Sequence, residues 1–368
     1  MITNEIKTAF DAFERGGNII SVNQITAGLI NATYLVETDK NEKYILQKIN
    51  TFVFKNPDEL MENIVGVTKH ITKRIKEAGG DYKRENLNFL PCNSGEYYFR
   101  DENDGAWRLY IYVDDAQTYN KPKDFNAFRD AGRAFGRFMK LLDGYPAETL
   151  HETIKNFHYT PARYENFLKA VNADIKGRKA LCEDEIQFVI DREADTHKLT
   201  DLIKEGVLPL RVTHNDTKLN NVLFDMKTDK GICVIDLDTI MPGLSLYDFG
   251  DSIRSGANKG AEDESDLSKV GIDISLFEVY VDGFLSETAE SLNDAEIDNL
   301  AYGAKIMTFE CGIRFLTDYL EGDVYFRTTH AEHNIVRARN QFKLVADMET
   351  HMDEMNAIVE KYKEKYKK

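Results

Sequence analysis

Cysteine is scarce in this chain and forms no metal-binding or redox pattern. Only four cysteines occur among 368 residues, at positions 92, 182, 233 and 311. They lie far apart and no C-x-x-C pair occurs, which argues against a zinc site and against a disulfide framework. We therefore expect reduced, buried thiols, as in a cytoplasmic protein.

Long apolar runs and an excess of positive charge are missing as well. No apolar run approaches the ~18 residues of a transmembrane helix, and the N-terminus lacks the charged-then-apolar pattern of a signal peptide. The formal net charge is −16, which argues against nucleic acid or an anionic membrane as partner. We expect a cytoplasmic monomer or homodimer whose partners are small molecules.

Internal repeats and low-complexity linkers are also absent, but the pattern of the chain changes near residue 113. Before it, short runs of Ile, Val, Tyr and Thr predict β-strands, and one helical segment starts at Pro57 and ends at Ala78, before Gly79 and Gly80. Beyond it, helical periodicity dominates. The expected strands cover residues 18–25, 32–38, 43–49, 87–90, 97–100 and 107–113. The expected helices cover residues 57–78, 124–142, 162–171, 183–203, 274–287, 294–320 and 332–366.

One polar segment between two short predicted strands is the most informative part of the chain. It reads H-x-D-x-K-x-x-N from His214 to Asn221, and an apolar run ending in Asp236 follows it. Phosphoryl transfer from ATP needs a base for the attacking hydroxyl, a cation near the γ-phosphate and oxygen ligands for Mg²⁺. Asp216 fits the base and Lys218 the cation, while Asn221 and Asp236 fit the magnesium ligands.

The same segment implies a role for His214 and for the architecture. We expect His214 to hold the loop by hydrogen bonds rather than to react. The spacing is typical of a kinase catalytic loop. We therefore predict an α+β, two-lobed protein-kinase-like fold. A small β-rich N-lobe over residues 1–113 would bind the nucleotide, and a larger helical C-lobe over 114–368 would carry the catalytic and substrate-binding groups.

Two aspartates compete for the second metal position. Asp248 stands in an Asp-Phe-Gly triplet, but it lies beyond a Met-Pro-Gly loop and just before a predicted helix start. There its carboxylate would cap the helix and accept backbone N–H bonds, from the catalytic loop among others. We therefore assign Asp236 to the metal and Asp248 to a structural role. Asp238 fits either a second metal contact or a solvated acid in a turn.

The predicted small lobe has a weaker signal. Kinases usually carry a lysine on the third strand, paired with a helix glutamate, and here Gln47 occupies that place. Lys48 is the alternative nucleotide ligand, although a solvated strand lysine fits it as well, and Glu62 is the candidate helix partner. No G-x-G-x-x-G loop occurs, and only Gly28 occupies the turn between the first two strands.

These residues resemble the aminoglycoside phosphotransferase/choline kinase superfamily, and most closely the bacterial N-acetylhexosamine 1-kinases. The resemblance covers roughly residues 18–350. It rests on the catalytic segment and on the stretches I-D-L-D-T-I-M-P-G and F-G-D-S-I-R. It also rests on Y-I-L-Q-K-I-N near the start and E-C-G-I-R-F-L-T-D-Y-L-E-G-D-V-Y-F near the end.

The resemblance implies ATP- and Mg²⁺-dependent phosphorylation of the anomeric hydroxyl of GlcNAc or GalNAc. On this mapping Asp216 is the base and contacts the sugar, while Tyr112 and Val113 form the hinge that meets adenine. Arg314 and Tyr325 match positions that line the sugar pocket. Their alternatives are an ion pair between Arg314 and Glu310 on one helix and a tyrosine packed in the core.

Two positions depart from the pattern of that group. The small-lobe turn usually reads G-H-I-N, but Leu29 replaces the histidine that would bond the sugar. Ser255 stands where an aromatic residue can follow S-I-R. A site with one polar contact and one stacking surface fewer can prefer another sugar.

Other functions fit part of the sequence. A kinase of a different hydroxyl compound, such as an aminoglycoside, choline, homoserine or another sugar, would use the same catalytic residues. A pseudokinase that senses nucleotide would have lost at least one of Asp216, Asn221 and Asp236, and all three are present. No A-P-E segment follows Asp236, which argues against a protein kinase.

Overall fold

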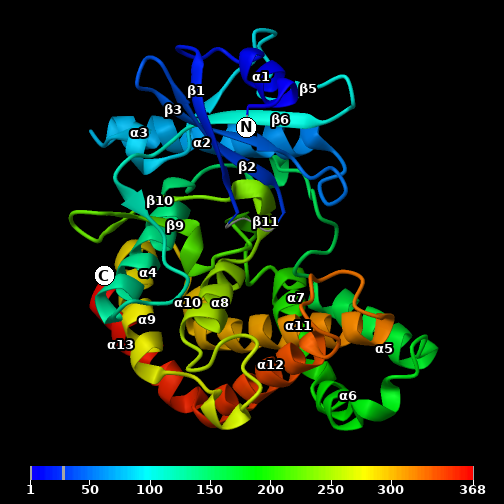
Figure 1. The fold of residues 1–368 in the computed structure, drawn as a ribbon. Coiled ribbons are helices and arrows are strands. Elements are labelled where there is room, and N and C mark those ends of the chain that lie inside the picture. Colours follow the sequence, from blue (N-terminus) through cyan, green and yellow to red (C-terminus); the bar gives the residue numbers. More distant parts are fainter. Residues whose placement is uncertain (1, 27–29, 368) are drawn as a thin grey trace. The chain divides into compact units, whose positions relative to one another are not determined.

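The computed structural model describes residues 2–26 and 30–367, and the chain forms two compact units. The smaller unit comprises residues 1–117, 141–155 and 223–241, and the larger unit comprises residues 118–140, 156–222 and 242–368. The predicted fold class is confirmed: an antiparallel sheet near the N-terminus and a helical remainder form a kinase-like fold. Figure 1 labels the helices and strands.

The smaller unit is built on an antiparallel sheet in the order β1-β2-β3-β6-β4, with β5 also paired to β6. Its register places Gln47 of β3 opposite Arg108 of β6. A second sheet, β10-β9-β7, brings a later part of the chain into this unit. The strands are β1 (Ile19–Ile25), β2 (Ala32–Thr38), β3 (Lys43–Lys48), β4 (Phe89–Leu90), β5 (Phe99–Arg100), β6 (Ala106–Ile111), β7 (Ala116–Gln117), β9 (Val222–Asp225) and β10 (Gly231–Val234).

Helices cover the sheet of this unit. The sequence predicted α2 (Pro57–Glu77), where Asn56 caps the first turn and Pro57 starts the helix. The sequence analysis did not predict α1 (Asn4–Asp11), which Figure 1 labels. Its Ile6 and Phe10 belong to the buried core around Trp107. The remaining helical turns are α3 (Tyr82–Glu85) and the 3₁₀ turns η1 (Ala147–Thr149) and η4 (Leu237–Thr239).

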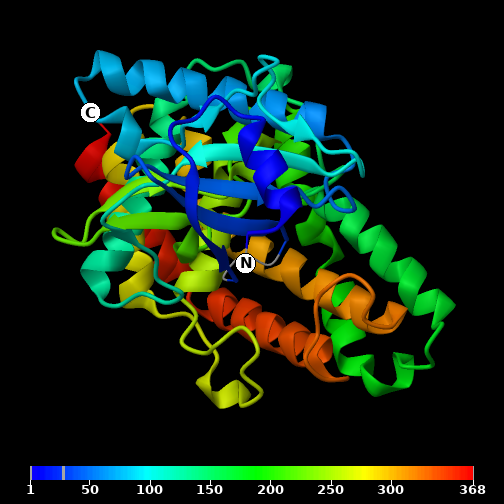
Figure 2. The same ribbon diagram turned by 45° about the horizontal axis from the view of Figure 1, so that its top comes forward.

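The larger unit is mostly helical. Figures 1 and 2 show its two longest helices, α11 and α12, side by side. Its helices are α4 (Phe125–Leu141), α5 (Thr160–Ala173), α6 (Glu183–Ile190), α7 (Glu193–Lys204), α8 (Ser245–Gly256), α9 (Ile274–Thr288), α10 (Asp294–Asp298), α11 (Leu300–Glu321), α12 (His333–Thr350) and α13 (Met352–Tyr366). A two-stranded pair, β8 (Arg211–Thr213) and β11 (Met241–Gly243), and the 3₁₀ turns η2 (Lys179–Leu181), η3 (Leu219–Asn221) and η5 (Leu267–Lys269) complete it.

Three predicted helices are each divided in two. The segment 183–203 breaks at Asp191 and Arg192 into α6 and α7, and the segment 332–366 breaks at His351 into α12 and α13. In the third, α10 ends and α11 begins at Asn299. None of these breaks contains proline or glycine, so the sequence carries no strong stop signal there.

The cysteines are reduced and remote from one another. Cys92, Cys182 and Cys233 are buried, and Cys311 is half-buried. Burial raises the pKa of Cys92 and Cys182 to about 11 and that of Cys233 and Cys311 to about 12, so their thiols stay protonated and unreactive.

Candidate active site

The predicted catalytic loop turns a single acid and a single lysine outward. It follows β8, passes through a left-handed residue at Asn215 (φ 64°) and ends in η3. Residues 214, 215, 217, 219 and 221 are buried, whereas Asp216 and Lys218 keep 27% and 40% of their side chains exposed. The loop therefore presents the two residues to which we assigned the chemistry.

Asp248 holds the backbone of this loop. Its carboxylate accepts hydrogen bonds from the backbone N–H groups of His214 (2.9 Å) and Asn215 (2.7 Å). Its carbonyl oxygen accepts the hydroxyl of Thr217, whose own carbonyl accepts the hydroxyl of Ser252 (2.7 Å). Burial raises the pKa of Asp248, and the nearby His214 opposes that rise.

One part of our expectation for Asp248 was wrong. Helix α8 starts at Ser245, so Asp248 lies inside its first turn and caps nothing in its own helix. The sequence suggested a later helix start because the segment before it contains a Met-Pro-Gly loop. The carboxylate does accept backbone N–H groups of the catalytic loop, which was the other part of the expectation.

His214 is fully buried and fixes the turn from inside. Its Nδ1 accepts the backbone N–H of Asp216 at 3.2 Å. The edges of Phe135 and Phe138 pack against its ring, with centroids 5.9 and 6.0 Å away. A buried imidazole bonded to the loop backbone has the position that a structural role requires.

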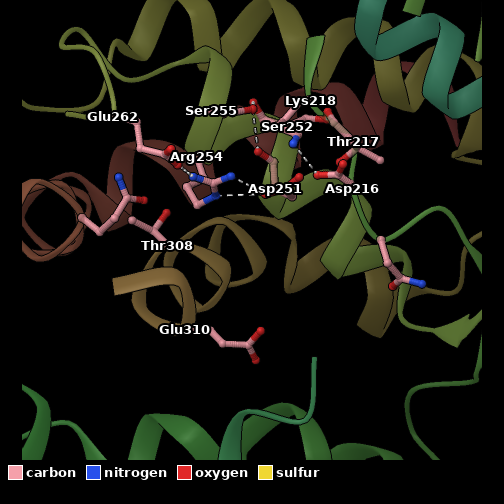
Figure 3. Close-up of polar contacts among 12 residues, drawn as sticks. Asp216, Thr217, Lys218, Asp251, Ser252, Arg254, Ser255, Glu262, Thr308 and Glu310 are labelled. Carbon is pink, nitrogen blue, oxygen red and sulfur yellow. Dashed lines mark hydrogen bonds and ion pairs between the residues drawn. The ribbon is translucent and has the colours of Figure 1, made fainter. Parts of the chain in front are cut away.

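Asp216, Lys218 and Asn221 form one cluster. The Lys218 ammonium lies 3.0 Å from the Asp216 carboxylate (Figure 3). The Asn221 amide nitrogen donates to the Asp216 carbonyl oxygen (2.8 Å) and to its carboxylate (3.3 Å). The side-chain oxygen of Asn221 is thereby left as the atom to offer a cation. The negative charge of Asp216 raises the pKa of Lys218, so Lys218 stays charged.

Arg254 of α8 forms ion pairs that we did not predict from the sequence. Arg254 pairs with Asp251 (2.8 Å) and with Glu262 (2.5 Å) (Figure 3). Burial alone would raise the pKa of Asp251, but Arg254 and Lys218 outweigh it and the pKa is lowered. The i, i+3 spacing within F-G-D-S-I-R was the available signal. Ser255 donates its hydroxyl to the Asp251 carbonyl oxygen (2.9 Å), so that group is used within the helix.

A buried relay joins the loop to helix α11. His158 Nε2 lies 3.0 Å from the carbonyl oxygen of Asn215, and its Nδ1 lies 2.8 Å from the Glu310 carboxylate. Thr160 donates its hydroxyl to the other oxygen of Glu310 (2.7 Å). Burial would raise the pKa of Glu310, but the neighbouring His158 outweighs it and the pKa is lowered. Glu310 is therefore engaged by His158 and Thr160, and the alternative of a Glu310–Arg314 ion pair is not what forms.

Arg314 and Tyr325, which the resemblance assigns to a sugar site, line one pocket. The pocket has a volume of about 200 Å³, and its lining includes Arg163, Lys169 and Glu321. The Arg314 guanidinium lies 5.8 Å from the Tyr325 ring centre. Tyr325 is 63% exposed, so the alternative of a packed core tyrosine is wrong.

In the smaller unit, the turn after β10 presents Asp236 and buries Asp238. Asp236 is exposed and has a left-handed backbone (φ 63°), a conformation that persists where the surroundings hold it. Asp238 is 3% exposed and forms an ion pair with Arg108 at 2.5 Å. The alternative of a solvated turn acid for Asp238 is therefore wrong, because the structure supplies a buried cationic partner.

The third strand carries its polar side chains in two directions. Gln47 donates to the Thr33 hydroxyl (3.0 Å) and accepts from Arg108 Nε (2.9 Å). Lys48 instead pairs with Glu5 of α1 (2.6 Å) and lies over the Trp107 ring. The structure thus joins Lys48 to α1, on the other face of the strand from Gln47.

The candidate helix partner Glu62 has another role. Its carboxylate lies 2.6 Å from His151 Nε2, so the pairing with a strand lysine that we considered does not form. Arg108 is the cation beside Gln47, and sequence spacing gave no sign of it, because the two meet only through strand register.

The predicted hinge follows β6. The backbone N–H of Tyr112 donates to the Lys43 carbonyl oxygen (3.1 Å), and Val113 is buried. An adenine contact at Tyr112 would therefore use its carbonyl oxygen. The assignments at Gly28 and Leu29 lie outside the described residues.

The proposed metal ligands would suit Mg²⁺ as a partner of bound phosphates. Within residues 2–26 and 30–367, no three His, Cys, Asp or Glu side chains gather into a metal site. Mg²⁺ usually binds proteins through one or two carboxylates together with substrate phosphates and water. The exposed carboxylate of Asp236 in the smaller unit and the amide oxygen of Asn221 in the larger unit are each oxygen ligands of the kind that suits this mode.

Comparison with solved structures supports the fold. A microcompartment-associated aminopropanol kinase shares 16% identity at a TM-score of 0.62, covering 95% of this chain and 97% of that one. An aminoglycoside phosphotransferase from Alicyclobacillus acidocaldarius shares 10% at 0.60, covering 98% and 97%. The amicoumacin kinase hAmiN, solved with AMP-PNP and Ca²⁺, shares 13% at 0.59, covering 94% of each chain.

A family model and the helices complete the comparison. None of the helices in the described part of the chain has the length and apolar character needed to cross a membrane. The model of the phosphotransferase enzyme family, APH, matches residues 21–268, more than half of the chain, including the catalytic loop and the Asp236 turn. The chain therefore belongs to the APH phosphotransferase enzyme family.

Proposed function

We propose that the protein is an ATP-dependent small-molecule kinase that phosphorylates the anomeric hydroxyl of an N-acetylhexosamine, giving the sugar 1-phosphate. The observation that carries the reaction is the catalytic loop, where a partly exposed Asp216 lies 3.0 Å from Lys218 on a buried, hydrogen-bonded backbone. Family membership supports phosphoryl transfer. The choice of acceptor rests on the sequence resemblance and on the pocket.

The proposed reaction transfers one proton and one phosphoryl group. Asp216 accepts the proton of the attacking hydroxyl, and the hydroxyl oxygen forms its bond to the γ-phosphorus as the bond to the ADP oxygen breaks. Lys218, held charged by Asp216, offsets negative charge on the transferred group. Asn221 and Asp236 are the proposed ligands of Mg²⁺, which would neutralise charge on the phosphates.

The pocket beside α11 suits a neutral, hydroxylated acceptor better than a cationic one. Its three cationic residues, Arg163, Lys169 and Arg314, outnumber its two carboxylates, Asp318 and Glu321, so a cationic substrate would meet net repulsion. Asp318, which also lines it, uses its carboxylate on backbone N–H groups, among them that of Tyr325 (2.8 Å). The exposed Tyr325 ring offers a flat apolar surface, which suits the apolar face of a sugar.

We also propose nucleotide ligands in the smaller unit. Tyr112 and Val113 would meet adenine through backbone groups, and Gln47 would supply a neutral donor near the phosphates. Leu29 and Ser255 are the two positions that differ from the pattern of the N-acetylhexosamine 1-kinases. The expected acceptor is therefore GlcNAc, GalNAc or a related sugar.

An ADP-release assay over sugars and amino alcohols tests this proposal. Turnover with N-acetylhexosamines and its loss in Arg314→Ala, with Arg327→Ala as an arginine control outside the pocket lining, would support it. Turnover confined to aminoglycosides, choline or homoserine would replace the sugar by a cationic acceptor. Nucleotide binding without any turnover would instead favour a nucleotide-sensing role.

A further inference from the structure

A buried polar network crosses the smaller unit and ends at the Asp236 turn. Arg108 of β6 lies at its centre, 2.5 Å from one Asp238 oxygen, and it donates from Nε to Gln47 (2.9 Å). Asn31 donates to the other Asp238 oxygen (2.5 Å) and accepts the backbone N–H of Asn50 (2.9 Å). Both oxygens of Asp238 are thus engaged, one by a charge and one by an amide.

This network is costly to bury. Arg108 is 2% exposed and Asp238 3% exposed, and removing two charges from water carries a large free-energy cost before their attraction is counted. Apolar residues of the same size often stabilise a fold equally well. The pair is therefore better explained by what it positions than by its contribution to stability.

The segment that the pair positions is the turn with the proposed metal ligand. Asp236 adopts φ 63° two residues before Asp238, and such a backbone is held only where its surroundings determine it. Arg108 and Asn31 fix the far side of this turn. Asn31 lies directly before β2, so the Asp238 carboxylate connects the start of this strand to the Asp236 turn.

The network places a cation next to the strand position where kinases usually carry a lysine. Gln47 occupies the strand position at which kinases usually carry a lysine, and the residue paired with it in register is Arg108. The cation is therefore present one strand over, and Gln47 contacts it through its side-chain oxygen.

We propose that Arg108 is a positioning residue that replaces the usual strand lysine, holding Asp238 and thereby the Asp236 turn in the geometry that binds Mg²⁺ with the nucleotide. Its burial means that it acts through Asp238 and not by touching the phosphates. This inference rests on the proposed kinase function, since it concerns how Mg·ATP is held.

The test is the Mg²⁺ dependence of nucleotide binding, measured with a fluorescent ATP analogue and no acceptor. We expect Arg108→Gln to raise the Mg²⁺ concentration for half-maximal binding at least ~10-fold, the scale seen when groups that support metal ligands are removed. Arg108→Lys should recover part of this loss. Arg100→Gln, an exposed arginine on β5, is the matched control and should bind as the wild type does.

A second variant keeps the test decisive if Arg108→Gln does not fold. Asn31→Ala removes the amide that holds the other Asp238 oxygen and leaves no unpaired buried charge, so it should fold and should raise the Mg²⁺ requirement in the same direction. A folded Arg108→Gln or Asn31→Ala protein with wild-type Mg²⁺ dependence would overturn this inference alone. A wild-type protein that binds no Mg·ATP would overturn the kinase proposal itself.

Discussion

The Lys218 ammonium lies 3.0 Å from the Asp216 carboxylate, two residues apart on a loop whose other side chains are mostly buried. Asp248 bonds the loop backbone from behind. The two charged groups are therefore held on a fixed frame before any substrate arrives. Such preorganisation is what transition-state stabilisation requires.

Asp216→Asn should abolish transfer while leaving the fold and nucleotide binding intact. Asparagine keeps the shape and cannot accept the hydroxyl proton, so kcat should fall ~10²–10⁴-fold or more. Single-turnover kinetics together with ATP-analogue binding would measure both effects. Near-normal kcat in this variant would remove Asp216 from the role of base.

Two substitutions of Asp236 should have the same effect on kcat and different effects on thermal stability. Asp236→Gly and Asp236→Ala should both lose at least ~100-fold in kcat, since each removes a proposed metal ligand. Glycine accepts φ 63° freely, whereas alanine there costs ~1 kcal/mol or more. Thermal melting should therefore place the glycine variant above the alanine variant. Equal melting temperatures would argue against a held left-handed backbone, and retained activity against the metal role.

Asp248→Asn should instead lower the stability of the fold. The amide NH₂ would face one of the two loop N–H groups that the carboxylate now accepts, which should cost ~1–3 kcal/mol of stability. Urea unfolding measures this loss, with the exposed Asp266→Asn as a control. If Asp248 were instead the metal ligand, the variant would lose Mg²⁺ binding at unchanged stability.

Acid should destabilise the wild type partly through Glu310. Its folded-state pKa is lowered below the ordinary 4.5, with His158 outweighing burial. The carboxylate therefore contributes stability that is present above pH 4.5 and lost as the pH falls through the lowered value. Glu310→Gln should show a shallower fall of Tm in this acid range, whereas exposed Glu205→Gln should follow the wild type. Parallel curves for Glu310→Gln and the wild type would show that Glu310 does not titrate as described.

Much of the fold was predictable because its patterns are local. Runs of Ile, Val, Tyr and Thr predicted the first three strands, and Pro57 marked the start of α2. Helix α1 was missed, since eight residues near the N-terminus give a weak periodic signal.

The candidate site was likewise predictable only where its residues are close together in the sequence. The residues 216, 218 and 221 lie within one short loop, so their spacing indicated the cluster that the structure contains. Arg108 meets Gln47 only through strand register. His158 meets Glu310 across 152 residues. Neither distance can be read from a single sequence, because both depend on how the chain folds back on itself.

The central claim is the transfer of phosphate to an anomeric hydroxyl. Incubation of the protein with MgATP and GlcNAc or GalNAc, followed by ¹H and ³¹P NMR of the product, tests it directly. We predict that the phosphorus couples to the anomeric proton, as in a sugar 1-phosphate, and that the product is absent with Asp216→Asn. Phosphate on another hydroxyl, or no sugar phosphate alongside turnover of a cationic acceptor, would contradict the account.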